Sequence, residues 1–168
     1  MLFLHADTRL GPGWADAVGR ALADPAVVGG AFRFSFARGE LAGRPLATRL
    51  GLCLVEWGAR LRVALFGTPY GDQAIFVRRS ALDALGGVPS APVMEDLDLV
   101  RELKRVGRLA QLVLPATTSP RRYLSDGVLR TVIRHRLAAL AWSLGVDRER
   151  VASWLRGEGV ARARGGSR

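Results

Sequence analysis

Apolar residues along this chain follow two periods, and the change from one to the other predicts its strands and helices. The opening "MLFLHADTRL" begins with an apolar run, which predicts a short buried strand that ends near His5 and Asp7. Residues 27–36 alternate apolar and polar positions, as in a strand with one packed face. The runs "QAIFVRR" (73–79) and "RLAQLVL" (108–114) predict two more strands, and we expect "ATTSPRRY" to continue the second in extended conformation.

Elsewhere apolar residues recur every three or four positions, which predicts helices. This spacing covers residues 14–23, 46–66 and 94–107. We expect Ser80 to cap a brief helix that ends before a Gly-Gly pair. Ser125 and Asp147 are expected to cap two final basic helices, because their side-chain oxygens can accept unpaired backbone N–H groups.

Strands that alternate with helices predict an α/β fold, here a mixed sheet flanked by helices and followed by C-terminal helices. We expect one domain over residues 1–156 and a disordered basic tail over residues 157–168. Sheets of this kind bind ligands at the carboxyl ends of their strands. The sequence places Asp7 at such an end, and the loop before Glu95 at another.

Composition narrows the class of protein. The chain has 168 residues, of which 49% are hydrophobic and 24% charged, which is typical of a folded domain and not of a disordered chain. No apolar stretch approaches the ~20 residues that span a bilayer. Asp7 and Arg9 interrupt the apolar start that a signal peptide would need. A single cysteine, Cys53, excludes a disulfide within the chain and argues against a zinc cluster, so we expect a cytoplasmic protein.

The formal net charge of +10 is unusual, and Lys104 is the only lysine among 25 Lys and Arg residues. Such a chain attracts phosphates, whether in a nucleotide, a nucleic acid or an anionic lipid. A solvated arginine-rich surface, as high-GC genomes produce, explains the charge as well. Because charge alone specifies no partner, we predict no nucleic-acid partner.

His5 and Asp7 are candidates for binding a divalent metal ion. A carboxylate at the end of a strand suits a hard cation, and a histidine two residues earlier would point the same way in a regular strand. The histidine suits manganese or zinc better than magnesium. Alternatively, Asp7 stabilises a turn through a side-chain hydrogen bond and His5 is a packed strand residue.

The pair Glu95-Asp96 precedes a helix, with Asp98 close behind. Acids at a helix start are stabilised by the helix dipole, and most do nothing more. The Gly- and Pro-rich loop before the pair gives the functional alternative: one acid would bind a metal and a separate acid would act as a general base. That arrangement suits the transfer of a group away from a phosphate.

The stretch "PYGDQAIFVRR" offers further ligand contacts. Gly71 would let the backbone approach a ligand, and Asp72 and Gln73 could hydrogen-bond to its hydroxyls, although a tight turn explains the same residues. Arg121 and Arg122 would bind a phosphate or lie exposed on an edge strand.

Four stretches, taken in order, resemble the family 2 glycosyltransferases of the GT-A fold. They are "LFLHADTRLGPGW", "VVGGAFRF", "YGDQAIFVRRSALDALGGVP" and "MEDLDLVRELKRVGRLA". The nearest likeness is to a bacterial branch associated with radical-SAM/selenodomain gene neighbourhoods, and it extends over nearly the whole chain. One stretch alone is a weak signal, whereas four in the family's order and spacing are specific.

The resemblance implies a GT-A-like, Rossmann-like sheet and an enzyme that moves a sugar from a nucleotide-diphosphate sugar to a hydroxyl acceptor. The transfer would invert the anomeric carbon with the help of Mg²⁺ or Mn²⁺. "HAD" stands where the family has Asp-x-Asp, so Asp7 matches its second acid, the metal and diphosphate contact, and His5 replaces the first. "ED" matches the family's acidic pair, which makes Asp96 the catalytic base and Glu95 its neighbour in acceptor binding.

"YGDQ" lies where the family forms the acceptor side of its pocket. The residues concerned are Tyr70, Gly71, Asp72 and Gln73. Processive synthases of the family also have a Gln-x-x-Arg-Trp motif, which this sequence lacks, so we do not expect a polymerising enzyme.

Family members begin with roughly another half-domain, in which a strand ends in Pro-x-Asn-Glu and further strands hold the nucleotide base. We therefore expect residues 1–156 to be an N-terminally truncated catalytic portion with an unpaired apolar sheet edge. Such an edge favours self-association or pairing with another chain. The alternative function is accordingly a split or non-catalytic fragment that needs a partner chain with the nucleotide-binding half.

A third hypothesis is peripheral attachment to an anionic membrane surface. Residues 125–145 combine apolar positions with Arg130, Arg134 and Arg136, a basic amphipathic pattern. A surface helix packed on the sheet gives the same pattern.

Overall fold

Five strands and seven α-helices alternate along residues 1–156, the part of the chain that the computed structural model describes. The predicted α/β class is confirmed, and the sheet is mixed as expected. The predicted basic tail over residues 157–168 lies outside the described residues.

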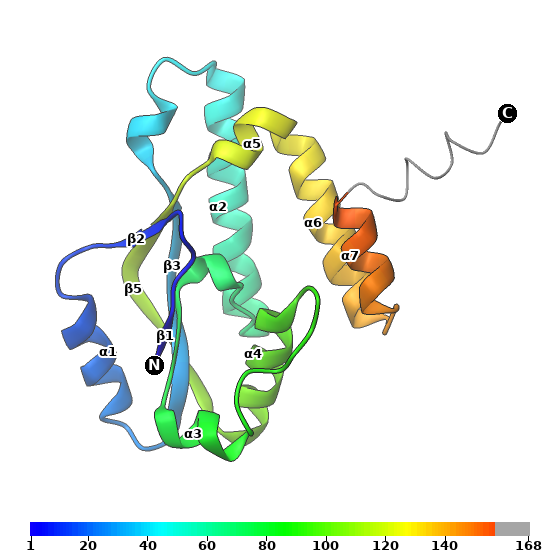
Figure 1. Ribbon diagram of the computed structural model, residues 1–168. Helices are drawn as coiled ribbons and strands as arrows, with labels where there is room; N and C mark the ends of the chain where they lie inside the picture. The colour runs from blue at the N-terminus through cyan, green and yellow to red at the C-terminus, as the bar shows by residue number, and fades with distance from the viewer. Residues whose placement is uncertain (157–168) are drawn as a thin grey trace, which may run out of the picture.

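The sheet has the strand order β1-β4-β3-β5-β2. The strands are β1 (Leu2–Phe3), β2 (Thr8–Leu10), β3 (Val27–Phe36), β4 (Ile75–Val77) and β5 (Arg108–Thr118). Only β3 and β5 run parallel, and the other neighbouring pairs are antiparallel. The two long strands therefore form the centre, and three short strands extend it on both sides (Figure 1).

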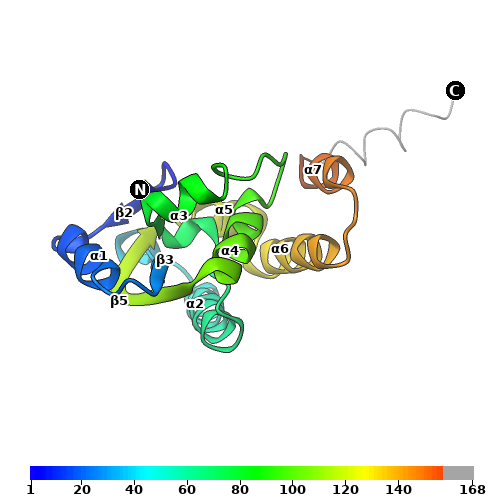
Figure 2. The same ribbon diagram turned by 90° about the horizontal axis from the view of Figure 1, so that it is seen from below.

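The helices cover both faces of this sheet. They are α1 (Trp14–Leu22), α2 (Leu46–Phe66), α3 (Arg79–Ala84), α4 (Glu95–Val106), α5 (Arg121–Asp126), α6 (Val128–Ser143) and α7 (Arg148–Arg156). Figures 1 and 2 show α1 on one side of the sheet and α4 on the other, with α6 and α7 extending beyond α4. The 3₁₀ turns η1 (Arg38–Leu41) and η2 (Gly71–Gln73) precede α2 and β4.

Alternating side chains of β4 divide the core into two layers. Ile75 and Val77 pack with α3 and α4, whereas Phe76 points to the other face and packs with Phe32 and the residues of α1. Burying apolar area on both faces stabilises the sheet by about 25 cal/mol per Å² removed from water, which explains why the short β4 reads as a continuous apolar run.

The C-terminal helices are attached to α4 through Asp98. Its carboxylate accepts hydrogen bonds from Arg101, from the indole N–H of Trp142 in α6 and from Arg148 in α7, all within 3.0 Å. This buried acid, which the sequence placed beside the candidate catalytic pair, thus connects three helices.

Several local predictions need correction. The chain after β5 does not stay extended, because residues 121–126 form α5, and Pro120 at its start has the backbone angle that a helix requires. Ser80 lies inside α3 and caps nothing, and Ser125 lies in α5, where its hydroxyl donates to the Arg122 carbonyl. Asp147 does cap α7, since its Oδ1 accepts a hydrogen bond from the Arg150 N–H.

None of the helices within residues 1–156 has the length and apolar character that crossing a bilayer requires. The predicted basic helix over residues 125–145 is divided into the end of α5 and α6, with Gly127 between them. Its main part, α6, packs against α2, α5 and α7, and Val128 at its start also packs against the cluster that includes Phe34 and Phe36 of β3.

Candidate functional site

The turn between β1 and β2 holds His5 and Asp7. The expected single strand is wrong here: only Leu2–Phe3 pair with β4, and the chain turns at once into β2, closed by a hydrogen bond from Thr8 N–H to the His5 carbonyl. Both side chains are exposed, and the Thr118 hydroxyl at the end of β5 donates a long hydrogen bond of 3.4 Å to Asp7 Oδ1. Asp7 therefore lies at the carboxyl end of β5 rather than at the end of its own strand.

Gly71 joins this turn to the start of α4. Its backbone N–H donates a 2.6 Å hydrogen bond to Asp96 Oδ2. A Cβ at Gly71 would lie 2.7 Å from His5 Nε2 and 3.3 Å from Asp96 Oδ2, closer than packed atoms approach. Glycine thus leaves room for the side chains of His5 and Asp96 at this backbone, where three segments distant in the sequence meet. The predicted site residues His5, Gly71 and Asp96 are neighbours.

Asp96 lies in the first turn of α4. Its Oδ1 accepts a hydrogen bond from the Leu97 N–H at 2.9 Å, and no ion pair involves it among residues 1–156. Each of its oxygens keeps a second lone pair, so the carboxylate can still accept a proton from a ligand hydroxyl. Glu95 is exposed and its side chain makes no hydrogen bond or ion pair within the described part of the chain.

Backbone strain marks the same place. Within residues 1–156, the non-glycine residues with positive φ are Ala74 (51°), directly after η2, and Met94 (62°), directly before α4. Such conformations cost of order 1–3 kcal/mol each and gather at binding and catalytic sites. Both strained positions thus adjoin the segments that hold Gly71 and Asp96.

Asp72 is the most perturbed acid of the site. Burial raises its pKa to about 6; Arg62 and His5 act in the opposite direction, and the negative charges of Asp96 and Asp7 raise the pKa further. Its Oδ1 is out of contact with solvent and has no hydrogen-bond partner. Asp72 therefore lies within electrostatic range of the other two carboxylates, and its buried oxygen is available to a ligand donor.

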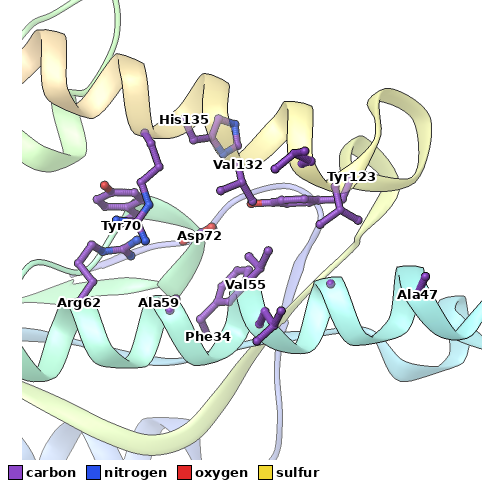
Figure 3. Close-up of a pocket in the computed structure, with 16 residues that line it drawn as sticks. Phe34, Ala47, Val55, Ala59, Arg62, Tyr70, Asp72, Tyr123, Val132 and His135 are labelled. Atoms are coloured by element: carbon purple, nitrogen blue, oxygen red, sulfur yellow. The ribbon is translucent and has the colours of Figure 1, made fainter.

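Asp72 also lines a cavity of about 470 Å³ between α2 and α6. The walls are mostly apolar side chains and glycines of the two helices, and Figure 3 shows Arg62 and Tyr70 at one end and Ala47 toward the other. Asp72 thus belongs both to the group of carboxylates and to the lining of the cavity.

Arg62 and Gln73 hold the segment before η2 in place. Arg62 donates to the Thr68 carbonyl and to Gln73 Oε1, both at 3.0 Å, and its guanidinium lies 3.4 Å from the ring centre of Tyr70. The Gln73 amide donates to the Phe32 carbonyl, and its oxygen also accepts the Tyr70 N–H. Gln73 was predicted to bind a ligand; its side chain is buried and bonded within the fold instead.

Tyr123 and His135 form the far side of the cavity. Their rings meet edge to face with centres 6.0 Å apart. Burial raises the pKa of Tyr123 to about 12, with a further contribution from the charge of Asp72. Burial and the nearby cations Arg122 and Arg134 lower the pKa of His135, so the imidazole is neutral at pH 7.

The structure does not bring every predicted residue to the carboxylates. Arg121 and Arg122 are exposed in the first turn of α5, and no hydrogen bond or ion pair within residues 1–156 joins either side chain to Asp7, Asp72 or Asp96. Sequence reasoning missed Arg62 and His135, which helix periodicity presents as ordinary surface positions.

A divalent metal remains compatible with the donors present. Within residues 1–156 no three His, Cys, Asp or Glu side chains are grouped so as to hold a metal ion. Mg²⁺, however, is usually held by one or two carboxylates, with substrate phosphates and water in the other positions. The exposed carboxylate of Asp7 is such a ligand, and the imidazole of His5 would suit Mn²⁺.

Comparisons of this chain with protein-family models, with curated proteins and with solved structures find no match.

Proposed function

We propose that this chain is the catalytic portion of a GT-A-like glycosyltransferase, which moves a sugar from a nucleotide-diphosphate sugar to a hydroxyl acceptor with inversion. The observation that supports it best is the meeting of His5, Gly71 and Asp96 at one end of the sheet, from three segments far apart in the sequence, with Asp7 two residues after His5. The order of the four resembling stretches is independent support.

Asp96 is the general base of this proposal. The acceptor oxygen attacks the anomeric carbon, the bond from that carbon to the diphosphate oxygen breaks, and Asp96 takes the hydroxyl proton. The Gly71 N–H fixes the carboxylate in one orientation by its short hydrogen bond. Asp72, whose pKa is near 6, offers a hydrogen bond to an acceptor hydroxyl.

Asp7 faces the donor in this scheme. A metal bound there would neutralise the negative charge that develops on the leaving nucleoside diphosphate. His5, beside Gly71, is placed to hydrogen-bond a diphosphate oxygen or to be a second metal ligand.

The test is a transfer assay with a panel of radiolabelled nucleotide-diphosphate sugars and hydroxyl acceptors, in the presence of Mg²⁺ or Mn²⁺. We expect a labelled product with wild-type protein, alone or complemented by a chain with the nucleotide-binding half, and about 100-fold less with Asp96→Asn under the same conditions. A product formed equally by both proteins would remove Asp96 from the base role.

A second candidate function, pairing with another chain, is supported by the edge of β5. β2 pairs only with residues 116–118 of this strand, so within residues 1–156 no strand covers the outer edge of residues 108–114. Val113 on this segment is 82% exposed. Unpaired strand edges attract further strands. Light scattering of wild type and Val113→Lys tests it: a dimer that the substitution converts to a monomer supports pairing, and a wild-type monomer at all concentrations contradicts self-pairing.

A further inference from the structure

Two neighbouring helices expose continuous apolar stripes. On α2 the stripe consists of Leu46, Leu50, Leu54, Trp57, Leu61 and Leu65, which are 39–68% exposed. On α6 and its C-cap it consists of Leu129, Ile133, Leu137, Leu140 and Leu144, which are 48–73% exposed. The spacing of three or four residues puts each stripe on one helix face.

These stripes do not face the core. The buried residues of α2 include Leu52 and Ala59, and those of α6 are Thr131 and Ala138, all on other faces of their helices. Figures 1 and 2 both show α2 and α6 side by side. Large contiguous apolar areas on a protein surface mark sites of interaction.

The exposed charges on the two helices have one sign. The only acid of α2 is Glu56, which is buried and bonded to Arg38, and α6 contains no acid. Exposed arginines border both stripes, Arg49 and Arg60 on α2 and Arg130 and Arg136 on α6, and the exposed acids Asp126 and Asp147 lie beyond the ends of α6. An apolar face on two helices that expose arginines and no acid is complementary to an anionic lipid bilayer.

The cavity between the helices opens onto this face. Leu54 and Leu129 line the cavity and belong to the exposed stripes, so the apolar surface continues from the outside into the cavity. Asp72 also lines the cavity, and it adjoins Gly71, whose N–H is bonded to Asp96. Asp72 therefore connects the lining of the cavity to the turn next to Asp96.

We propose that α2 and α6 rest on an anionic membrane surface, and that the cavity between them binds the hydrocarbon chain of a membrane-borne alcohol. This alcohol is the hydroxyl acceptor of the transfer reaction, a step that rests on the function proposed above. Its chain occupies the apolar walls, and its hydroxyl group reaches Asp72 and Asp96.

Membrane binding is tested by sedimentation with vesicles of phosphatidylglycerol and phosphatidylcholine. We expect wild-type protein to sediment with them, and the double variant Leu50→Asp/Leu137→Asp to bind at least tenfold more weakly. Both positions are about half exposed, so the substitutions leave the fold intact. Val106→Asp, an exposed apolar-to-acid change at the end of α4, is the matched control and should bind as wild type does. Equal binding by the double variant, or no binding by wild type, would overturn the membrane contact. If wild type does not bind vesicles and light scattering shows it to be a dimer, the stripes join two copies of the chain and do not contact a membrane.

The cavity is tested with decanol as the probe in a calorimetric titration. Gly58→Leu adds a side chain into the cavity, where a Cβ would meet only Arg136 Nη2, at 3.7 Å. We expect this variant to bind decanol at least tenfold more weakly and vesicles as well as wild type. Gly19→Leu in α1, which has open space around its Cβ, is the matched control. Unchanged decanol binding by Gly58→Leu would place the chain elsewhere and overturn the proposal.

The two proposals fail separately. Binding of decanol and vesicles without sugar transfer to any acceptor would refute the transferase and leave the chain-binding cavity in place. Sugar transfer to short, water-soluble alcohols by a protein that binds neither vesicles nor decanol would refute the lipid acceptor and leave the transferase.

Discussion

Asp96 and Asp98, two residues apart on α4, differ in their burial and in their hydrogen-bond partners. Asp98 is buried and its carboxylate is bonded to Arg101, Arg148 and Trp142. Asp96 is partly exposed and accepts only backbone N–H groups, from Gly71 and Leu97. Asp96 therefore forms no ion pair within residues 1–156, although the chain contains many arginines.

Glu56 extends the comparison to a second structural acid. It is buried in α2, accepts the Phe36 N–H at 2.7 Å and pairs with Arg38 at 2.6 Å. Asp7 and Asp72, in contrast, form no ion pair within residues 1–156. Asp98 and Glu56 are thus paired with arginines, whereas Asp7, Asp72 and Asp96 are not, and this difference yields predictions for each group.

Asp96→Asn should have the largest effect on activity. Loss of a general base lowers turnover by about 100-fold or more, with donor binding nearly unchanged, because the amide keeps the shape but cannot take the proton. Steady-state kinetics and thermal unfolding measure the two effects. If the variant loses stability but keeps its turnover, Asp96 has a structural role like that of Asp98 and is not the general base.

Asp98→Ala should give the opposite result. Removing the buried acid leaves Arg148 and the Trp142 N–H without a partner, which we expect to lower the free energy of unfolding by about 2–3 kcal/mol. Urea unfolding followed by circular dichroism measures it, and turnover per folded molecule should stay within twofold of wild type. An unfolding midpoint equal to that of wild type would show that Asp98 does not hold α6 and α7 to α4.

Asp72→Asn should stabilise the protein in a pH-dependent way. The pKa of Asp72 is raised from 3.8 in the unfolded chain to about 6 in the folded one, so its contribution to stability is present below pH 4 and lost as the pH rises through 6. Asparagine does not titrate, so the variant should exceed wild type by about 1–3 kcal/mol at pH 7 and equal it near pH 4. Urea unfolding at both pH values measures the difference. If the variant exceeds wild type in stability by the same amount at both pH values, burial does not raise the pKa of Asp72.

Gly71→Ala should have the smallest effect, and it should act through His5. The added Cβ would lie 2.7 Å from the exposed His5 ring, which can move away at little cost in stability. We expect turnover to fall about tenfold because the geometry around Asp96 is disturbed. In a His5→Ala background the same substitution should cost much less, and equal losses in both backgrounds would exclude His5 as the cause.

Long periodic segments were predictable from the sequence. The helix over residues 46–66 and the strand over 27–36 have the bounds that their patterns indicate. The strand was expected to pack on one face only, but residues 27–32 are all buried, so β3 is covered on both faces there. The turn at His5 and Asp7 was missed because β1 has only two residues, too few for a periodic signal. The helical spacing over residues 46–66 predicted the helix α2 but not that its apolar stripe is exposed.

Parts of the candidate site depend on contacts that no local pattern contains. The pKa of Asp72 is raised because the carboxyl is buried beside α2 and α6. Asp98 differs from Asp96 in its hydrogen bonds to Trp142 and Arg148, which lie far along the chain. Residues 121–123 were expected to continue the strand in extended conformation, but the helix α5 begins at Arg121, with Pro120 as its N-cap. Sequence pattern thus predicts the elements, whereas the roles of single acids follow from tertiary packing.

The most direct test of the transferase site asks whether nucleotide binding depends on Asp7 and not on Asp96. We propose to titrate wild type, Asp7→Asn and Asp96→Asn with uridine and guanosine diphosphates in the presence and absence of Mn²⁺. We predict metal-dependent binding of one of the nucleotides by wild type and Asp96→Asn, and its loss in Asp7→Asn. Nucleotide binding that ignores both the metal and the Asp7 carboxylate, or no binding by wild type, would contradict a donor site at this end of the sheet.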